Sequence, residues 1–408
     1  MLRVRAVFMA GALAAGGGLA GTVSVAASTV LSGCDSAITA PGTYVLGADL
    51  DCSASSSDGV DIESSNVTLN LEGYAIEGGT GANGYDGVFV YSGGELKNVT
   101  VENGTIEDWE TDVFVSGASN FTASKLTLAV DGTNDYDGFE GESIDKGSVS
   151  AVDVSGSAAD GFELYDNASL KVGDSTADNG EYGFVGEYND ADTYLSDTAN
   201  GNAEEGFDEM YSNATTFSKN QADGNYAVGI DADCDDAGAV TAEGNSAYYN
   251  GDGIVLDECI GYTKTAYINS LIKFNSAIDN VADGFDDTDS FGASWLENVA
   301  KYNGGYGMNL IYPGDDTVAW NVTSHNATGI YLEENYSSGD VDSASYNEAF
   351  YNDDYGLYAD AAAPGSHNDA LDNTPFDCFN FVCISNSTMA KAPAASMPRG
   401  RRASGAAG

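Results

Sequence analysis

The chain has 408 residues, with 64 Asp and Glu against 14 Lys and Arg, which gives a formal net charge of −50. No arginine occurs between residues 28 and 398. Like-charge repulsion therefore argues against nucleic acid and anionic membrane surfaces as partners. Because the charge also repels itself, we expect surroundings in which salt or bound divalent cations screen it.

Residues 1–27 have the pattern of a secretory signal peptide. Arg3 and Arg5 precede an apolar run rich in Gly and Ala, and Val25-Ala26-Ala27 ends it as a cleavage site would. A retained membrane anchor is one alternative, and a lipid on Cys34 within Leu31-Ser32-Gly33-Cys34 is another. No later segment is long and apolar enough to cross a membrane. We expect a secreted or cell-surface protein with no membrane span once the signal is removed.

A unit recurs about every 23 residues in the following part of the chain. It consists of Asn, a second Asn five residues on, and then Gly followed by an apolar residue. The clearest copies begin at Asn220/Asn225, Asn245/Asn250, Asn275/Asn280, Asn298/Asn303, Asn321/Asn326 and Asn347/Asn352, with Asp197/Asn202 and Asp174/Asn179 before them. A fixed period of this length predicts a solenoid.

The residues after each Gly alternate between inward and outward positions, as strand residues do. One apolar residue per coil should then stack inside: Phe139, Phe162, Phe184, Phe207, Ile230, Ile254, Phe285, Met308, Ile330 and Leu357. The Asn residues should hydrogen-bond their equivalents in neighbouring coils, as Asn ladders do. About thirteen coils, with strands about 4.8 Å apart, predict a rod about 60 Å long.

These repeats, together with segments 34–46 and 66–76, resemble the right-handed parallel β-helix repeat family, which includes NosD-like and pectate-lyase-like proteins. The resemblance implies an all-β, single-stranded right-handed parallel β-helix over residues 58–375. We expect an N-terminal cap or first coil at 28–57, a C-terminal cap at 376–389 and a disordered basic tail at 390–408. It does not imply an activity, because this architecture hosts lyases, hydrolases, epimerases, adhesins and inert scaffolds.

Six cysteines in an exported chain predict disulfide bonds. Cys234 and Cys259 follow the glycines of adjacent repeats by five and six residues, so neighbouring coils should bring them within bonding reach. We also expect Cys34–Cys52 across the N-terminal cap and Cys378–Cys383 near the C-terminal end. Metal binding by these thiols is disfavoured, since the chain has two His and no Cys-x-x-Cys pair.

Outward positions on the strands after Gly carry a strip of carboxylates over the middle coils. Three interpretations remain open: glycoside chemistry by paired carboxylates, a calcium site, and a solvated acidic face without a specific role. The candidate catalytic residues are Asp208, Asp231, Asp233, Asp257 and Asp286, and the candidate calcium ligands are Asp231, Asp233, Asp286 and Asp287. Outward Tyr331 and Tyr358 are candidate sugar-binding residues.

Known enzymes of the resembled family narrow the first interpretation. Pectate lyase-like, pectin methylesterase-like and alginate epimerase-like members use an arginine, and residues 28–398 contain none. Polysaccharide hydrolases of the family typically add a Gly-His-Gly-like element, which is absent from this sequence. We therefore predict a protein that binds a polysaccharide or cell-envelope surface, with calcium as a possible cofactor. A polysaccharide hydrolase or lyase and a structural spacer are the alternatives.

Overall fold

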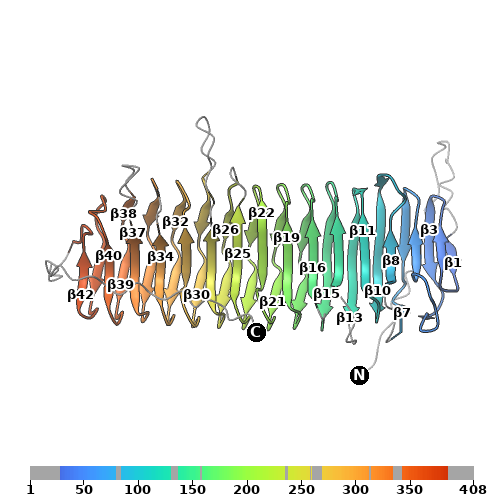
Figure 1. The fold of residues 1–408 in the computed structure, drawn as a ribbon, viewed down its shortest axis with the longest axis horizontal. Helices are drawn as coiled ribbons and strands as arrows, with labels where there is room; N and C mark the ends of the chain where they lie inside the picture. Colours follow the sequence, from blue (N-terminus) through green and yellow to red (C-terminus); the bar gives the residue numbers. More distant parts are fainter. Residues whose placement is uncertain are drawn as a thin grey trace, which may run out of the picture.

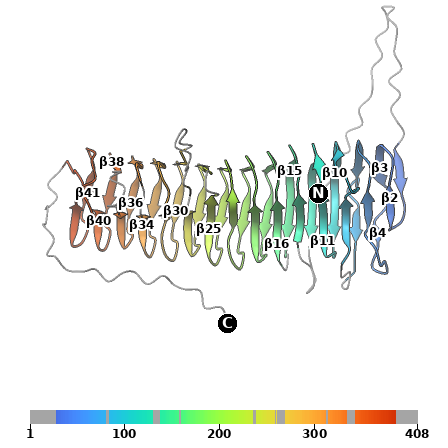
Figure 2. The ribbon, with the colours of Figure 1, turned by 45° about the horizontal axis from the view of Figure 1, so that its top comes forward.

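The computed structural model describes residues 28–79, 84–129, 137–156, 159–234, 238–257, 259, 269–311, 314–333 and 342–384. The expected signal peptide and basic tail lie outside these residues. Across the described chain, strands stack into a rod (Figures 1 and 2). It contains no helix long and apolar enough to cross a membrane.

Each coil contributes one strand to a 15-stranded parallel sheet that runs along one side of the rod. Leaving out β2 and β42 at its ends, thirteen strands remain, from β5 to β40, as expected for about thirteen coils. The fifteen strands are β2 (Ser36–Ile38), β5 (Val60–Ile62), β8 (Asp86–Val90), β11 (Thr111–Ser116), β14 (Asp137–Glu142), β16 (Asp160–Tyr165), β19 (Tyr182–Glu187), β22 (Phe207–Ser212), β25 (Val228–Cys234), β28 (Asp252–Asp257), β31 (Phe285–Thr288), β34 (Tyr306–Ile311), β37 (Thr328–Glu333), β40 (Tyr355–Ala359) and β42 (Phe376–Phe379).

Most other strands form a second, 25-stranded sheet that divides into two rows. The first row is β1 (Thr29–Leu31), β3 (Gly42–Leu46), β6 (Val67–Asn70), β17 (Lys171–Gly173), β20 (Thr193–Leu195), β23 (Thr216–Ser218), β26 (Thr241–Glu243), β29 (Leu271–Lys273), β32 (Ser294–Leu296), β35 (Thr317–Ala319) and β38 (Ser343–Ser345). The second row is β4 (Leu50–Asp51), β7 (Ala75–Glu77), β18 (Thr176–Asp178), β21 (Thr198–Asn200), β24 (Gln221–Asp223), β27 (Ser246–Tyr248), β30 (Ser276–Ile278), β33 (Val299–Lys301), β36 (Val322–Ser324), β39 (Glu348–Phe350) and β41 (Asp369–Leu371).

Three longer strands, β10 (Val99–Glu107), β13 (Thr122–Ala129) and β15 (Ser148–Ser155), pair with both rows and join them. β9 (Leu96–Lys97) and β12 (Ala118–Ser119) form a separate pair. At the N-terminal end, β2, β3 and β4 pair with β5, β6 and β7. Residues 28–57 therefore have the same strand arrangement as the coils that follow.

The predicted inward column is confirmed. Phe207 lies directly beside Ile230, and Ile230 beside Ile254, in the parallel register of the 15-stranded sheet. All ten expected residues, from Phe139 to Leu357, are at most 3% exposed. The Phe184 and Phe207 rings stack 4.7 Å apart. The rod therefore has a continuous apolar interior. Its fold is the expected right-handed parallel β-helix.

The recurring Gly is required by the close approach of neighbouring coils. A Cβ on Gly206 would lie 2.6 Å from the carbonyl oxygen of Gly229, and one on Gly229 would lie 2.6 Å from that of Gly253. Any side chain here would force the strands apart, because real Cβ atoms do not approach an oxygen so closely.

Two buried Asn ladders run along the rod, as expected. In the first, Asn245 Nδ2 donates to Asn275 Oδ1 at 3.0 Å, and Asn275 Nδ2 donates to Asn298 Oδ1 at 3.1 Å. The predicted copy at Asp174/Asn179 is wrong by one residue. The ladder positions in that coil are Ser175 and Gly180, whose amides donate to Asp197 and Asn202, because this coil is 22 residues long.

All three expected disulfide bonds are present: Cys34–Cys52, Cys234–Cys259 and Cys378–Cys383. Cys234 ends β25 and Cys259 follows β28, so their bond joins neighbouring coils. Cys34 precedes β2 and Cys52 follows β4, so their bond joins the two ends of the first coil. The bond at Cys34 occupies the sulfur that a lipid anchor would need.

Candidate functional site

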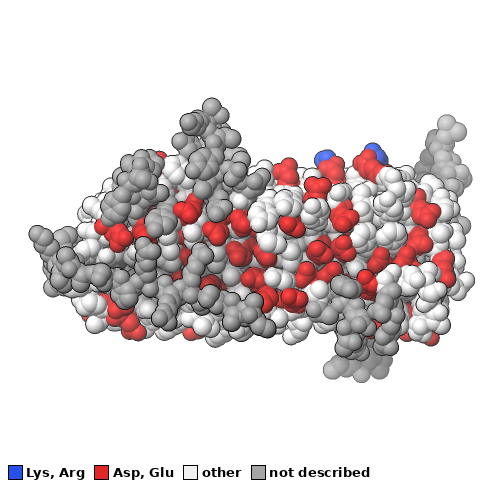
Figure 3. Space-filling model, viewed as in Figure 1, with Lys and Arg blue, Asp and Glu red and all other residues white. Residues whose placement is uncertain are grey.

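The outer surface of the 15-stranded sheet carries the candidate site, because alternate residues of every strand point away from the core. Acidic side chains are spread along much of the rod in Figure 3, with Lys and Arg visible only at its edge. We call this surface, built by outward residues of the strands from β14 to β42, the outer face.

Four of the five predicted catalytic residues form two pairs on adjacent strands of the outer face. Asp208 on β22 is the register partner of Asp231 on β25, and Asp233 on β25 is that of Asp257 on β28. All four side chains are partly exposed. Register partners are about 4.8 Å apart at Cα, which is close to the carboxyl separation of about 5 Å found in acid–nucleophile pairs of retaining glycosidases.

Asp286 on β31 is separated from these pairs, because Val255 lies between it and Asp231 in the same column. It belongs to another acidic group with Asp252 and Asp283. Asn309 Nδ2 donates to Asp286 Oδ1 at 3.0 Å and to Asp283 Oδ2 at 3.3 Å. These bonds hold the two carboxylates on either side of one amide.

Crowding changes the acidity of the outer face. Burial, reinforced by neighbouring carboxylates, raises the pKa of Asp208 and of Asp286 to about 6. The pKa of Asp231 is raised well above its usual range by burial and by Asp208. Groups with such pKa values can hold or release a proton near neutrality, which a general acid requires.

Asp287 does not share the outer face with the other proposed calcium ligands. It follows Asp286 on β31, so its side chain points to the opposite side of the strand, and it is 0% exposed. The structure thus leaves Asp231 and Asp233 alternating on one strand, with Asp286 two coils away.

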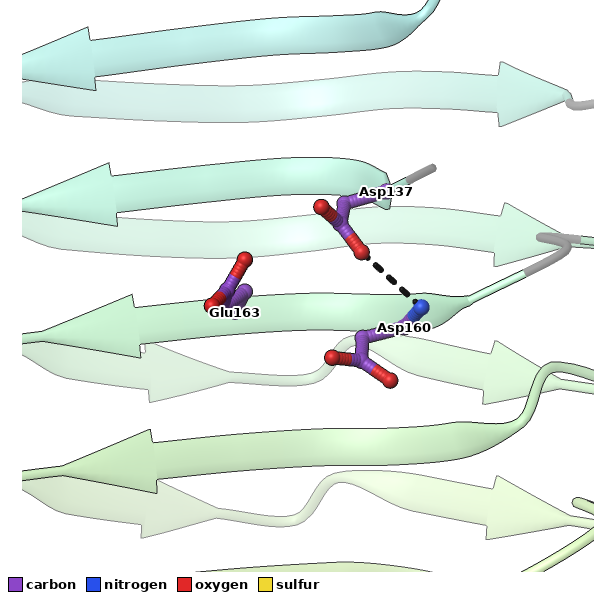
Figure 4. Close-up of side chains that lie close together, drawn as sticks. All are labelled: Asp137, Asp160 and Glu163. Carbon is purple, nitrogen blue, oxygen red and sulfur yellow. Dashed lines mark hydrogen bonds between the residues drawn. The ribbon is translucent and has the colours of Figure 1, made fainter. Parts of the chain in front are cut away.

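The tightest carboxylate group among the described residues was not singled out from the sequence. One oxygen each from Asp137, Asp160 and Glu163 lie within 4.8 Å of one another, and the Asp160 amide donates to Asp137 Oδ1 at 2.9 Å (Figure 4). Glu140 lies beside Glu163 in register. Burial raises the pKa of Asp137 to about 7 and that of Asp160 to about 8. This arrangement could hold a metal ion.

The missed signal is an Asp that directly precedes the repeat Gly. Strand alternation alone does not place this residue, since it lies where the chain turns into the strand. The Asp-Gly pairs recur at Asp58, Asp86, Asp137, Asp160, Asp252 and Asp283. Asp137 and Asp160 are neighbours in this series, and so are Asp252 and Asp283, since in each pair the later amide donates to the earlier carboxylate. They add acidic groups along the edge of the outer face.

Tyr331 and Tyr358 lie side by side on the outer face, beyond the acidic groups. Their ring centroids are 5.4 Å apart and nearly parallel, and Phe379 continues the stack at 4.9 Å from Tyr358. Tyr306 packs on the other side of Tyr331 at 5.3 Å. Since the rings cover one another's faces, they present mainly edges and hydroxyl groups outward. We call these four residues the aromatic stack.

Comparison with known proteins supports the architecture. The family described as "Right handed beta helix region" matches residues 86–237. The A-module of the mannuronan C-5 epimerase AlgE6 of Azotobacter vinelandii superposes with a TM-score of 0.53 at 18% identity, covering 85% of this chain and 90% of the module.

Two further solved structures are similar. A mutant of the periplasmic alginate epimerase AlgG gives a TM-score of 0.51 at 15% identity, covering 76% of this chain and 78% of that chain. A tailspike protein mutant of the E. coli bacteriophage HK620, in complex with a pentasaccharide, gives 0.45 at 15% identity and covers 81% and 72%. No curated protein sequence matches significantly. At these identities the likeness is one of fold.

Proposed function

We propose that this chain, a right-handed parallel β-helix protein, acts outside the cytoplasm by binding a polysaccharide along its outer face. The observation that carries the proposal is the continuity of acidic groups and the aromatic stack along one sheet. Asp208, Asp231, Asp286, Asn309, Tyr331 and Tyr358 follow one outward column, interrupted by Val255. An extended polymer parallel to the rod would meet all of them.

The chemistry of the column suits a glycan. Carboxylates and the Asn309 amide accept or donate hydrogen bonds to sugar hydroxyls, and the tyrosine edges and hydroxyls offer both apolar and polar contact. With no arginine in the described residues, a neutral glycan fits the outer face better than an anionic one. Two proteins of similar fold are named as mannuronan and alginate epimerases, which makes a polysaccharide a reasonable class of ligand.

Export is supported by the three disulfide bonds. Disulfides persist in oxidising compartments and are rare in the cytosol. Together with the signal-like residues 1–27, they favour a secreted or cell-surface protein.

Calcium is the cation that we propose for Asp137, Asp160 and Glu163. Ca²⁺ prefers several carboxylate oxygens, and this group supplies three from two adjacent strands. A cation here would relieve the repulsion among these carboxylates and Glu140. It would order the outer face at the end opposite the aromatic stack.

The aromatic stack provides the direct test. We expect the double variant Tyr331→Ala/Tyr358→Ala to lose at least about tenfold in affinity for the bound polysaccharide, about 1.4 kcal/mol or more. Affinity is measured by electrophoresis in gels containing single polysaccharides, with and without calcium. Tyr346→Ala is the matched control, since Tyr346 also lies in a ring stack, with Trp320 and His367, but at the turn between the two rows of short strands. Equal affinity of the double variant and the control would contradict the proposal.

Hydrolysis or elimination of a polysaccharide is the second candidate function. The two carboxylate pairs, Asp208 with Asp231 and Asp233 with Asp257, favour it, together with the raised pKa values of the first pair. Such an enzyme should release reducing ends or unsaturated products, and Asp231→Asn should abolish release while leaving binding intact. A protein that binds a polysaccharide without ever releasing product supports the binding function alone.

A further inference from the structure

Exposed aromatic side chains gather along the second row of short strands, away from the outer face. They occupy the corner directly after each strand: Tyr302 follows β33, His325 follows β36 and Tyr351 follows β39. Tyr302 and Tyr351 are 52% and 53% exposed, and their rings pack against His325 at 4.7 and 5.4 Å. Trp320, at the opposite corner just before β36, is 55% exposed.

The strands between these corners also present apolar side chains to the solvent. The middle residue of each three-residue strand is buried, so its two neighbours point outward. The apolar members of this outward set are Ile278, Val299, Val322, Phe350 and Leu371. We call the outward surface of β30, β33, β36, β39 and β41, together with the four corner residues, the second-row face.

Coils nearer the N-terminus carry polar residues at the same positions. The strands of the row are linked in register from β18 through β24 to β30. The outward residues of β18, β21 and β24 are Thr176, Asp178, Thr198, Asn200, Gln221 and Asp223. The coil therefore does not require apolar or aromatic residues here. An exposed patch of this kind marks an interaction surface.

A second copy of the chain is the partner that the charges of the second-row face fit. With a net charge of −50, two copies repel each other over most of their surface. The outward residues of the second-row face include only two carboxylates, Glu348 and Asp369, and one lysine, Lys301. None of the ion pairs within the described chain involves Lys301. Aromatic residues with few charges are typical of the centre of a protein–protein interface.

A two-fold axis through β36, with the two rods antiparallel, pairs these residues. Since β33 and β39 flank β36 in register, β33 of one copy then lies opposite β39 of the other. Lys301 comes within about two residues, roughly 7 Å along the strand, of Glu348 of the second copy. A lysine side chain spans that distance. Symmetry makes this pair twice.

The apolar residues match in the same arrangement. Tyr302 of one copy meets Tyr351 of the other at the corner. One coil further out, β30 lies opposite β41, so Ile278 meets Leu371. Parallel rods, related by an axis along their length, would instead set Lys301 against Val299 and Glu348 against Phe350. Both charges would then lack a counter-charge, so the antiparallel arrangement is favoured.

We propose that the chain forms an antiparallel, two-fold symmetric dimer through the second-row face. The inference goes beyond the proposed function and does not depend on it. The second row and the 15-stranded sheet belong to separate sheets, so each copy keeps its outer face free.

Analytical ultracentrifugation of the full chain over a concentration series tests the dimer. We expect twice the mass of one chain at the higher concentrations. Lys301→Glu should weaken association at least about tenfold, because like charges then meet twice across the axis, and Glu348→Lys should weaken it similarly. The double variant Lys301→Glu/Glu348→Lys should restore association. Lys219→Glu is the matched control, since Lys219 is exposed on a coil outside the second-row face.

Zero-length cross-linking gives the second readout. A water-soluble carbodiimide, applied to a mixture of unlabelled and isotope-labelled chains, should join Lys301 to Glu348 between chains. The proposal is overturned if the native chain is a monomer at every concentration, or if the double variant associates no better than the single ones. A cross-link from Glu348 to Lys391 within one chain would also overturn it, because the basic tail would then cover the face.

Discussion

The Asn side chains of the two ladders satisfy backbone groups that the turns leave unpaired. Asn275 illustrates this: its Oδ1 accepts the Asn245 amide at 2.8 Å, and its Nδ2 donates to the Ala242 carbonyl at 2.8 Å. Both partners are buried away from water, the Asn245 amide between β26 and β27 and the Ala242 carbonyl on β26. One amide side chain thus supplies the acceptor and the donor that no strand pairing provides.

Asn275→Ala should therefore be costly for its size. Two buried backbone groups would lose their partners, at about 1–3 kcal/mol each, so we expect a loss of about 2–6 kcal/mol in the free energy of unfolding. Urea denaturation measures it. The control is Asn269→Ala in the same coil, where the side chain is exposed and the change should stay within about 0.5 kcal/mol. Similar losses in the two variants would show that the ladder contributes nothing beyond ordinary surface contacts.

At the scale of the strands, the sequence predicts the direction of side chains within a strand better than that of residues where a strand begins. Strand alternation after each Gly correctly places Phe207, Ile230 and Asp231, because the side-chain period of a strand is two. Asp137 and Asp160 escape it, because they are the first residues of β14 and β16. Alternation from Phe139 and Phe162 would point them inward, but their carboxylates lie beside that of Glu163. Alternation from Phe285 also assigns Asp287 to the interior. The prediction of Asp287 as a calcium ligand beside Asp286 disregarded this alternation.

The outer-face strands should make stability depend on pH. The pKa of Glu140 is raised to about 8, and that of Asp160 to about 8, mainly by burial and then by neighbouring carboxylates. Unfolded carboxyl groups titrate near pH 4, so the folded state binds more protons between about pH 4 and pH 8, and stability falls as pH rises through that window. The melting temperature at low salt should therefore decrease from about pH 5 to pH 9.

Glu140→Gln should reduce this decrease, since it removes one of the raised groups. Asp353→Asn, at an exposed turn, should leave the decrease unchanged. A melting temperature that rises over the same interval in the native chain would show that these carboxylates are not crowded as described.

The whole molecule combines a net charge of −50 with a rod that stacks acidic residues in register. Repeat contacts between neighbouring coils stabilise such a rod, while charge repulsion along the outer face opposes them. Cations or a bound ligand that bridges several coils would shift this balance toward the folded rod. A polysaccharide bound along the outer face, as proposed, would be such a ligand.

Carboxyl footprinting with and without polysaccharide is the most direct test of the claim that the outer face binds a glycan. A water-soluble carbodiimide labels accessible Asp and Glu, and mass spectrometry locates the labels. We expect the bound polysaccharide to protect Asp208, Asp233 and Asp257, while exposed Asp279 and Asp353 continue to react. Protection confined to Asp279, Asp353 or other residues away from the 15-stranded sheet would contradict the account.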